Sequence, residues 1–282
     1  GTETTGDYAY GIFNDGAYNT TTVSGSITTA GDQARGIYND GDENTTTLSG
    51  SILTTGDTAY GIYNLGNKNT TTMSGSITTT ADSARGIYNR GDENINTISG
   101  SITTGGNSAH GIDNEGASNE INVSGSIKTA GENAHGIANY RGSSNKITVS
   151  GTVKATGARS VALYNSNGSG NSLTLNEGAT IIGDITANGA PGLFPFLSAN
   201  NATDSKLIFN LGASTSYAYS VSGKGEGTGG GQWTFSDLDG RSQVVTTTGT
   251  GCDMTIGGGG AIDTCNLVTA VGAANAEVQN EL

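Results

Sequence analysis

The chain has 282 residues, of which 47 are glycine and 33% are hydrophobic, and its formal net charge is −13 at pH 7. This acidic balance argues against nucleic-acid partners, which bind through Lys and Arg side chains that neutralise phosphates, and against anionic membrane surfaces. No stretch approaches the roughly 20 apolar residues that span a bilayer. The chain starts at Gly1 without a signal peptide, so we expect a processed or trimmed product.

A motif of 25 residues repeats along the first part of the chain. The segment Ala-Tyr-Gly-Ile-Phe-Asn at 9–14 returns as Ala-Arg-Gly-Ile-Tyr-Asn at 34–39, and in similar form in the following repeats. A repeat of this length, rich in Gly, Asn and Thr, is typical of a solenoid, in which each coil packs against its neighbours. The sequence therefore predicts regular coils over 1–189 and an irregular continuation with a terminal cap over 190–282.

Stacking the coils turns each repeat position into a column of side chains spaced by about 4.8 Å. Short alternating segments with β-branched residues predict strands, and breaks in the alternation predict corners. We expect an all-β, right-handed, three-sided parallel β-helix of about 25 residues per coil, with a corner at Gly11 that uses the freedom of glycine in φ. The apolar columns expected to face inward include Ile12, Ile37, Ile62, Ile87, Ile112 and Ile137, and Ile27, Ile52, Ile77, Ile102, Ile127 and Val153.

Two Asn columns recur in every regular coil, beginning at Asn14 and Asn19. Stacked amides can form hydrogen-bonded ladders; the alternative is that each Asn adopts a left-handed turn conformation. An acidic column begins at Asp7, Asp32 and Asp57. For it we expect Asx-turns, in which each carboxylate accepts a backbone N–H two residues on, with weak divalent-cation binding as the alternative. No metal site and no cofactor are predicted.

The candidate binding residues form two neighbouring columns that combine aromatic and basic side chains. Because one column holds charged residues, we expect it to be exposed, and exposed Tyr and Arg are typical of binding surfaces. The alternative is cation–π packing between successive coils. The first column is Tyr10, Arg35, Tyr60, Arg85, His110 and His135, and the second is Phe13, Tyr38, Tyr63 and Tyr88.

Two other surface motifs have a structural and a functional interpretation. Arg90-Gly91-Asp92 could act as an integrin-type tripeptide, but a single substitution in the repeat also accounts for it. Outward Thr pairs such as Thr20 and Thr22 form a flat array over three coils. Such arrays are also how β-helical ice-binding proteins order water, which makes ice binding a minor alternative.

The last third of the chain loses the period after Ile185. Residues 190–198 hold both prolines and predict a loop, and strand-like segments resume at 206–211, 217–221, 232–235 and 243–247. Cys252 and Cys265 lie close together in a Gly-rich stretch without nearby His, so a disulfide formed in an oxidising compartment is a better hypothesis than a zinc site.

The segment 173–185, Leu-Thr-Leu-Asn-Glu-Gly-Ala-Thr-Ile-Ile-Gly-Asp-Ile, resembles the turns of bacterial autotransporter passenger domains, and so do the Val-Ser-Gly-Ser-Ile repeats before it. The resemblance covers about 6–250. It implies export through an outer-membrane β-barrel and display on the bacterial cell surface. No catalytic motif of that family is present, and no catalytic residue is predicted.

Taken together, these features predict an adhesin of the self-associating kind rather than an enzyme. Its expected partners are host surface glycans, matrix proteins or identical passengers on neighbouring cells, as in biofilm formation and virulence. The rival interpretation is a glycan-processing enzyme or a tailspike-like β-helix, which needs carboxylates or basic residues clustered in a groove. In this sequence the repeat spreads the acidic residues instead.

Overall fold

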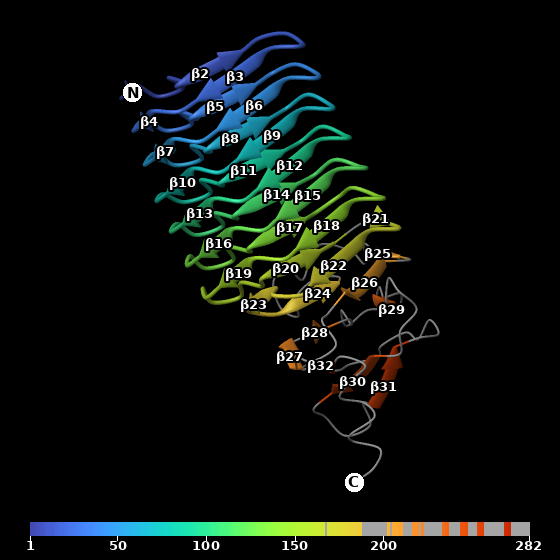
Figure 1. Ribbon diagram of the computed structural model, residues 1–282. Helices are drawn as coiled ribbons and strands as arrows, with labels where there is room; N and C mark the ends of the chain where they lie inside the picture. The colour runs from blue at the N-terminus through green and yellow to red at the C-terminus, as the bar shows by residue number, and fades with distance from the viewer. Residues whose placement is uncertain are drawn as a thin grey trace.

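The computed structural model describes residues 1–166 and 168–187, and strands between Ala202 and Val271. Its described elements are all β-strands, and three parallel sheets stack into a β-solenoid of about 7 turns with about 25 residues per coil. Figure 1 shows the coils stacked one below the other from the N-terminal end. The predicted three-sided parallel β-helix is therefore confirmed. Among the described residues, no helix has the length and apolar character needed to cross a bilayer.

Each coil contributes one strand to each sheet, in the order A, B, C along the chain. Sheet A contains β1 (Thr2–Thr4), β4 (Ser26–Thr29), β7 (Ser51–Thr54), β10 (Ser76–Thr79), β13 (Ser101–Thr104), β16 (Ser126–Thr129), β19 (Thr152–Ala155) and β23 (Thr180–Ile182). Sheet B contains β2 (Ile12–Asn14), β5 (Ile37–Asn39), β8 (Ile62–Asn64), β11 (Ile87–Asn89), β14 (Ile112–Asn114), β17 (Ile137–Asn139), β20 (Leu163–Asn165), β24 (Ile185–Ala187) and β28 (Val221–Ser222). Sheet C contains β3 (Thr20–Val23), β6 (Thr45–Leu48), β9 (Thr70–Met73), β12 (Ile95–Ile98), β15 (Glu120–Val123), β18 (Lys146–Val149), β22 (Ser172–Asn176), β26 (Ser205–Asn210) and β29 (Trp233–Ser236).

The strands pair in register, so equivalent residues of successive coils lie side by side. Ile62, for example, pairs with Ile37 on one side and Ile87 on the other. The offset becomes 26 residues where Ile121 pairs with Ile147, because the turn at 140–142 holds one extra residue. The repeat position is thus a physical column, as predicted.

The core lies between the three sheets and consists of the predicted apolar columns. Ile37, Ile62 and Ile87 are each 0% exposed, and burying a side chain of this size stabilises a fold by about 1.5–3 kcal/mol. One inner column of sheet C changes character along the axis, from hydroxyl to amide to hydrocarbon. It runs Thr21, Thr46, Thr71, Asn96, Ile121 and Ile147.

The corner glycines serve a purpose that differs from the predicted one. Gly11 and its equivalents are not in the left-handed region. A Cβ on Gly61 would lie 2.4 Å from Ile77 Cγ2 and 2.6 Å from the Gly86 carbonyl oxygen, so the column needs glycine for space. The left-handed positions, with φ between 53° and 64°, fall on other residue types: Tyr8, Gln33, Thr58, Ser83, Ser108, Asn133 and Arg159 at one corner, and Tyr18, Glu43, Lys68, Glu93, Ser118 and Ser144 at another.

The first Asn column forms the predicted ladder. Asn14 Nδ2 donates to Asn39 Oδ1 at 2.6 Å, and Asn39 Nδ2 donates to Asn64 Oδ1 at 2.7 Å. The ladder breaks between Asn89 and Asn114, where Asn89 Nδ2 and Asn114 Oδ1 are buried without a hydrogen-bond partner.

The second Asn column and the acidic column bond to backbone instead. Asn44 Oδ1 accepts the backbone N–H of Asn19 at 2.8 Å, so an amide ladder is wrong for this column. Asp7 Oδ1 accepts the N–H of Asp32 at 2.9 Å, which makes the Asx-turn prediction wrong as well. Side chains at these positions therefore tie one coil to the next.

Several strands beyond 200 fall where the sequence predicts them. β26 and β29 continue sheet C, and β27 (Ser216–Tyr219) and β30 (Gln243–Thr247) belong to a four-stranded sheet with β32 (Val268–Val271) and β31 (Asp253–Ile256), in which the described pairings are antiparallel. The predicted loop at 190–198 and the Cys252–Cys265 disulfide lie outside the described residues.

Candidate functional site: an aromatic and ionisable stripe on sheet B

The two columns of candidate binding residues meet on the outward side of sheet B. We call this set the sheet B stripe. The rings of Tyr38, Tyr63 and Tyr88 stack in sequence, with centroids 5.0 Å apart and planes within 14°. Tyr60 packs edge-on against Tyr63 and Tyr88. The structure therefore brings together the residues that the sequence placed in separate columns.

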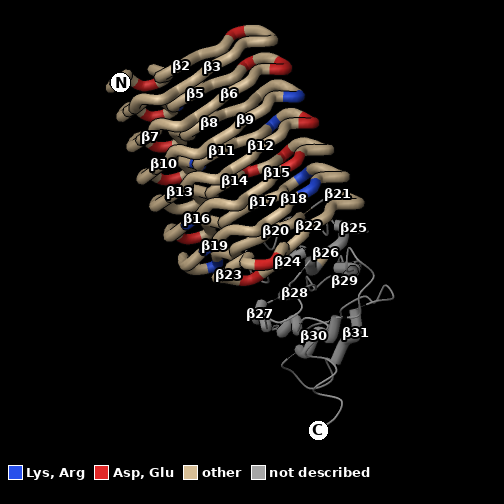
Figure 2. The backbone as a smooth tube through the Cα atoms, in the orientation of Figure 1, with Lys and Arg blue, Asp and Glu red and all other residues tan. Residues whose placement is uncertain are grey.

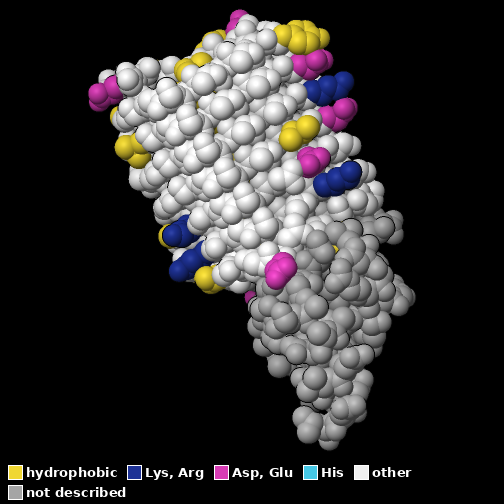
Figure 3. Space-filling model, viewed as in Figure 1, with side chains coloured by type: hydrophobic (Ala, Val, Ile, Leu, Met, Phe, Trp, Pro, Cys, Tyr) yellow, Lys and Arg dark blue, Asp and Glu magenta, His cyan; other side chains and the backbone are white. Residues whose placement is uncertain are grey.

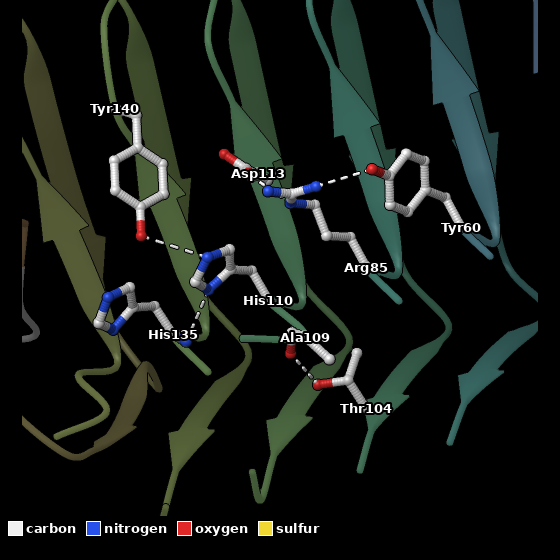
Figure 4. Close-up of polar contacts among 8 residues, drawn as sticks. All are labelled: Tyr60, Arg85, Thr104, Ala109, His110, Asp113, His135 and Tyr140. Atoms are coloured by element: carbon white, nitrogen blue, oxygen red, sulfur yellow. Dashed lines mark hydrogen bonds and ion pairs between the residues drawn. The ribbon is translucent and has the colours of Figure 1, made fainter. Parts of the chain in front are cut away.

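Arginines lie between the rings. Arg35 Cζ is 4.9 Å from the ring centre of Tyr38 and 4.8 Å from that of Tyr63, and Arg85 Cζ is 4.5 Å from that of Tyr88. Arg85 Nη1 also donates to the Tyr60 hydroxyl at 2.9 Å (Figure 4). Cation–π attraction of this kind contributes about 0.5–1 kcal/mol at an exposed site and about 2 kcal/mol when desolvated.

The expectation that the charged column is exposed is wrong, because three of its six residues are buried and Tyr10, Arg35 and Arg85 are half-buried. Tyr60 is 6% exposed, His110 4% and His135 1%. The two columns interdigitate, so that each ring covers its neighbours and the half-buried guanidinium groups pack against the faces of the tyrosine rings. Packing between coils therefore accounts for the middle of the stripe. Phe13, at the N-terminal end, is the exception and is 47% exposed.

Asp113 interrupts the tyrosine column and forms an ion pair with Arg85 (Figure 4). Its side chain is fully buried, and this burial raises the pKa of Asp113 to about 7, against the lowering effect of Arg85. A buried pair of this kind depends on both partners, because removing one leaves an uncompensated charge.

His110 and His135 continue the stripe as a stacked pair, with ring centres 4.9 Å apart and planes within 5°. Nδ1 of His110 accepts the backbone N–H of His135 at 2.9 Å, and Nδ1 of His135 accepts that of Val161 at 3.1 Å. These bonds require both rings to be neutral, with the proton on Nε2. Burial lowers the pKa of His135 to about 4 and, together with His135, lowers the pKa of His110 well below its usual value.

Sequence reasoning missed two members of the stripe. Tyr140 has its hydroxyl 3.2 Å from His110 Nε2 (Figure 4), and Tyr164 stacks on His135 with centroids 4.6 Å apart. Tyr164 falls in the Phe13 column once the extra residue at 140–142 is counted, so a corrected register would have found it. Tyr140 lies beside that insertion, and no repeat position predicted its contact.

The Arg90-Gly91-Asp92 tripeptide lies in a turn that is bonded to the next coil. Asp92 Oδ1 accepts the backbone N–H of Ala117 at 2.7 Å, and the Gly91 carbonyl accepts Asn94 Nδ2 at 2.8 Å. A hydrogen bond to the Tyr63 hydroxyl raises the pKa of Arg90. These contacts hold the tripeptide against the solenoid.

Sheets C and A carry a different surface. In the first four coils their outward positions hold Thr or Ser, apart from Glu3, Leu53 and Ile95. Figure 2 shows most Asp and Glu residues along the edges of the solenoid, and Figure 3 shows a broad face with few charged side chains between such edges. The predicted outward Thr pairs lie on this face.

The described part of the chain contains no group of three His, Cys, Asp or Glu residues placed to hold a metal ion. A cavity of about 10 Å³ between Ile147, Leu163, Asn165 and Leu173 has room for about one water molecule.

The fold and the site together define a parallel β-solenoid that carries an aromatic and ionisable stripe on the outward side of sheet B. Comparison with protein-family models, curated proteins and solved structures finds no match.

Proposed function

We propose that this chain is the rod-like passenger of a bacterial autotransporter, displayed on the cell surface, where it acts in adhesion or in self-association between cells. The resemblance of 173–185 and of the 25-residue repeats to passenger domains supports this class. The proposed localisation is extracellular, and the proposed partners are surface glycans, matrix proteins or identical passengers on another cell.

The observation that carries the proposal is the repetition of outward Thr and Ser side chains over the first four coils, on a scaffold whose coils are tied together by hydrogen-bonded columns. Neighbouring coils place equivalent groups about 4.8 Å apart. Each contact with a partner surface is weak, but a rigid array presents many at once, and linked contacts reach an avidity far above that of a single one. The strength of adhesion should therefore increase with the number of coils in the rod.

Removing whole coils tests this directly. Deleting residues 51–100 removes two repeats and joins equivalent positions, because Ile52 and Ile102 occupy the same column. Cells that display the full-length protein should clump or bind host cells or matrix, and cells that display the shortened rod at the same density should do so more than tenfold less. Cells without the protein are the control. Failure of the intact protein to mediate any of these contacts would refute the proposal.

A second candidate function, ice binding, is favoured by the hydroxyl-rich face of sheets C and A. This face is larger than the three-coil Thr array predicted from sequence, because the Ser and Thr columns of sheet A adjoin it. Thermal hysteresis of the purified chain, compared with a Thr47→Lys variant, tests this candidate. Equal freezing behaviour of both proteins and of buffer would dismiss it.

A further inference from the structure

Two lysines lie side by side on the outward side of sheet A. Lys128 of β16 pairs in register with Lys154 of β19, so the two side chains occupy neighbouring places in one column. Neighbouring strands are about 4.8 Å apart, and like charges directly opposite each other on a sheet are destabilising. In the preceding coils the same column holds Thr78 and Thr103. The lysine pair therefore carries a cost that the scaffold itself does not require.

The lysine pair also differs from the other basic side chains between residues 1 and 187 that the structure describes, because each of those lies beside an acidic residue or an aromatic ring. Arg35 and Arg90 lie beside tyrosines, Arg85 and Arg141 beside Asp113, Arg159 beside Glu132, Lys146 opposite Glu120, and Lys68 between Glu43 and Glu93 in its corner column. Within the same range Lys128 and Lys154 form no ion pair, and Thr103 and Ile182 are their neighbours in the column. The two ammonium groups are therefore available to an external anion.

The surroundings of the pair on this face are hydroxyl groups and one hydrocarbon side chain. Ser126 and Thr152 pair in register with each other. They flank Lys128 and Lys154, because side chains two residues apart in a strand point to the same face. Ile182 follows Lys154 in the lysine column and is 44% exposed. A ligand held by the two ammonium groups thus meets hydroxyls on one side and hydrocarbon at one end.

The charge of the solenoid changes along its axis near this position. Residues 1–120 contain 14 acidic and four basic residues, whereas residues 121–187 contain three acidic and five basic ones. Figure 3 shows basic side chains near the C-terminal end of the broad face formed by sheets C and A. Charge of one sign attracts oppositely charged partners. This end of the solenoid therefore favours an anion, although the chain as a whole is acidic.

From these observations we infer that Lys128 and Lys154 bind the acid group of an anionic glycan on the outward side of sheet A. Two ammonium groups can hold the charged oxygens of one sulfate or carboxylate through charge-assisted hydrogen bonds. The hydroxyls of Ser126 and Thr152 bond to hydroxyls of the sugar, and Ile182 covers C–H groups of its ring. This inference rests on the proposed function, because it names the kind of surface glycan that the rod binds.

Binding of fluorescently labelled oligosaccharides to the purified chain tests the inference, measured by anisotropy in about 150 mM salt so that charges beyond about 8 Å are screened. The probes are a dextran sulfate oligosaccharide, an oligogalacturonate and a neutral dextran oligosaccharide. We expect at least one of the two acidic probes to bind and the neutral probe not to bind. The acidic probe that binds identifies the ligand group as sulfate or carboxylate.

Lys128→Glu is the most informative variant, because it places an acid beside Lys154 in the way that Glu120 stands beside Lys146. It should weaken binding of the acidic probe about tenfold, since it removes one attraction and adds one repulsion. It should also keep or raise the midpoint of urea unfolding, since opposite charges replace like charges on neighbouring strands. Lys128→Gln and Lys154→Gln should each weaken binding about two- to fivefold, the effect of one exposed ion pair.

Lys146→Gln is the matched protein control. It removes one exposed positive charge from the same coil as Lys128, but its neighbour in register is Glu120 instead of a second lysine. Binding of the acidic probe to this variant should match that of the unmodified chain.

Three results would overturn the inference: neither acidic probe binds, the neutral probe binds as tightly as the acidic ones, or Lys128→Glu and Lys146→Gln bind the acidic probe equally. The adhesive function is tested separately with displaying cells. Cells that adhere although the purified chain binds neither acidic probe would leave the proposed function standing and remove this site. Lysine-dependent binding of an acidic probe by a chain that mediates no adhesion would keep the site and refute the adhesive function.

Discussion

Gly61 allows a direct test of why glycine recurs at the corner before sheet B. In Gly61→Ala the new Cβ would lie 2.4 Å from Ile77 Cγ2 and 2.6 Å from the Gly86 carbonyl oxygen, about 1 Å inside normal contact. That carbonyl accepts the N–H of Ile62 at 3.0 Å. Moving it away loses a hydrogen bond worth about 1 kcal/mol, and forcing extra volume into a packed core costs about 1–3 kcal/mol. We therefore expect a loss of about 2–4 kcal/mol.

Gly105→Ala is the matched control. Its Cβ would have no neighbour closer than 3.7 Å, and the residue is outside the left-handed region. This substitution should be neutral or stabilise the protein by about 0.4–1 kcal/mol, because it restricts the unfolded chain. Urea unfolding followed by far-UV circular dichroism gives both midpoints. Equal midpoints for the two variants would refute the spatial explanation of the glycine column.

The remaining predictions use the same measurement. Asn64→Leu should lower the free energy of unfolding by about 1–3 kcal/mol, because Asn64 bonds both neighbours in its ladder. Asn96→Ile should raise it by about 1–3 kcal/mol, since both amide atoms of Asn96 are buried without partners; a loss would contradict this. Arg85→Ala should lower the free energy of unfolding by about 3–5 kcal/mol, because it leaves Asp113 buried without its partner. Arg159→Ala should lower it by at most about 1 kcal/mol, because the ion pair between Arg159 and Glu132 is exposed. Burial lowers the pKa of His135 in the folded protein to about 4, from the ordinary value of 6.5 that applies to the unfolded chain. As the pH falls from 6.5 towards 4, the unfolded chain binds a proton at this residue and the folded protein does not, so the free energy of unfolding falls over this range. His135→Gln should therefore remove up to about 3 kcal/mol of the acid-induced loss, and an unchanged pH profile would count against it.

Most of the fold followed from the sequence because the repeat fixes which side chains stack. An apolar residue in the same position of successive coils, as in the Ile62 column, can be buried continuously only if the coils are in register. The same logic predicted the ladder from Asn14 to Asn89. It failed for Asn44 and Asp7, because stacking says which residues are adjacent but not whether a side-chain oxygen will meet an amide or a backbone N–H.

The sequence predicted which residues line the candidate site, but it did not predict that most of the aromatic rings and both histidines are buried. The sequence identified Tyr60, Arg85 and His110 as one column, and it offered cation–π packing as an alternative to exposure. Burial of that column arises from interdigitation with the Tyr63 and Tyr88 column on the outside of a sheet. Strand alternation divides residues into inward and outward sets and gives no indication that the outward set forms a second small core.

The change from threonine to isoleucine inside sheet C also changes how the first Asn column is held. In the N-terminal coils the threonine hydroxyl accepts a hydrogen bond from the asparagine of the same coil, as where Asn39 Nδ2 donates to Thr46 Oγ1 at 3.2 Å. Ile121 and Ile147 occupy the same column further along and offer no acceptor. The amide ladder is therefore bonded across the core to sheet C at the N-terminal end of the solenoid, and in the coils of Ile121 and Ile147 it has only hydrocarbon opposite.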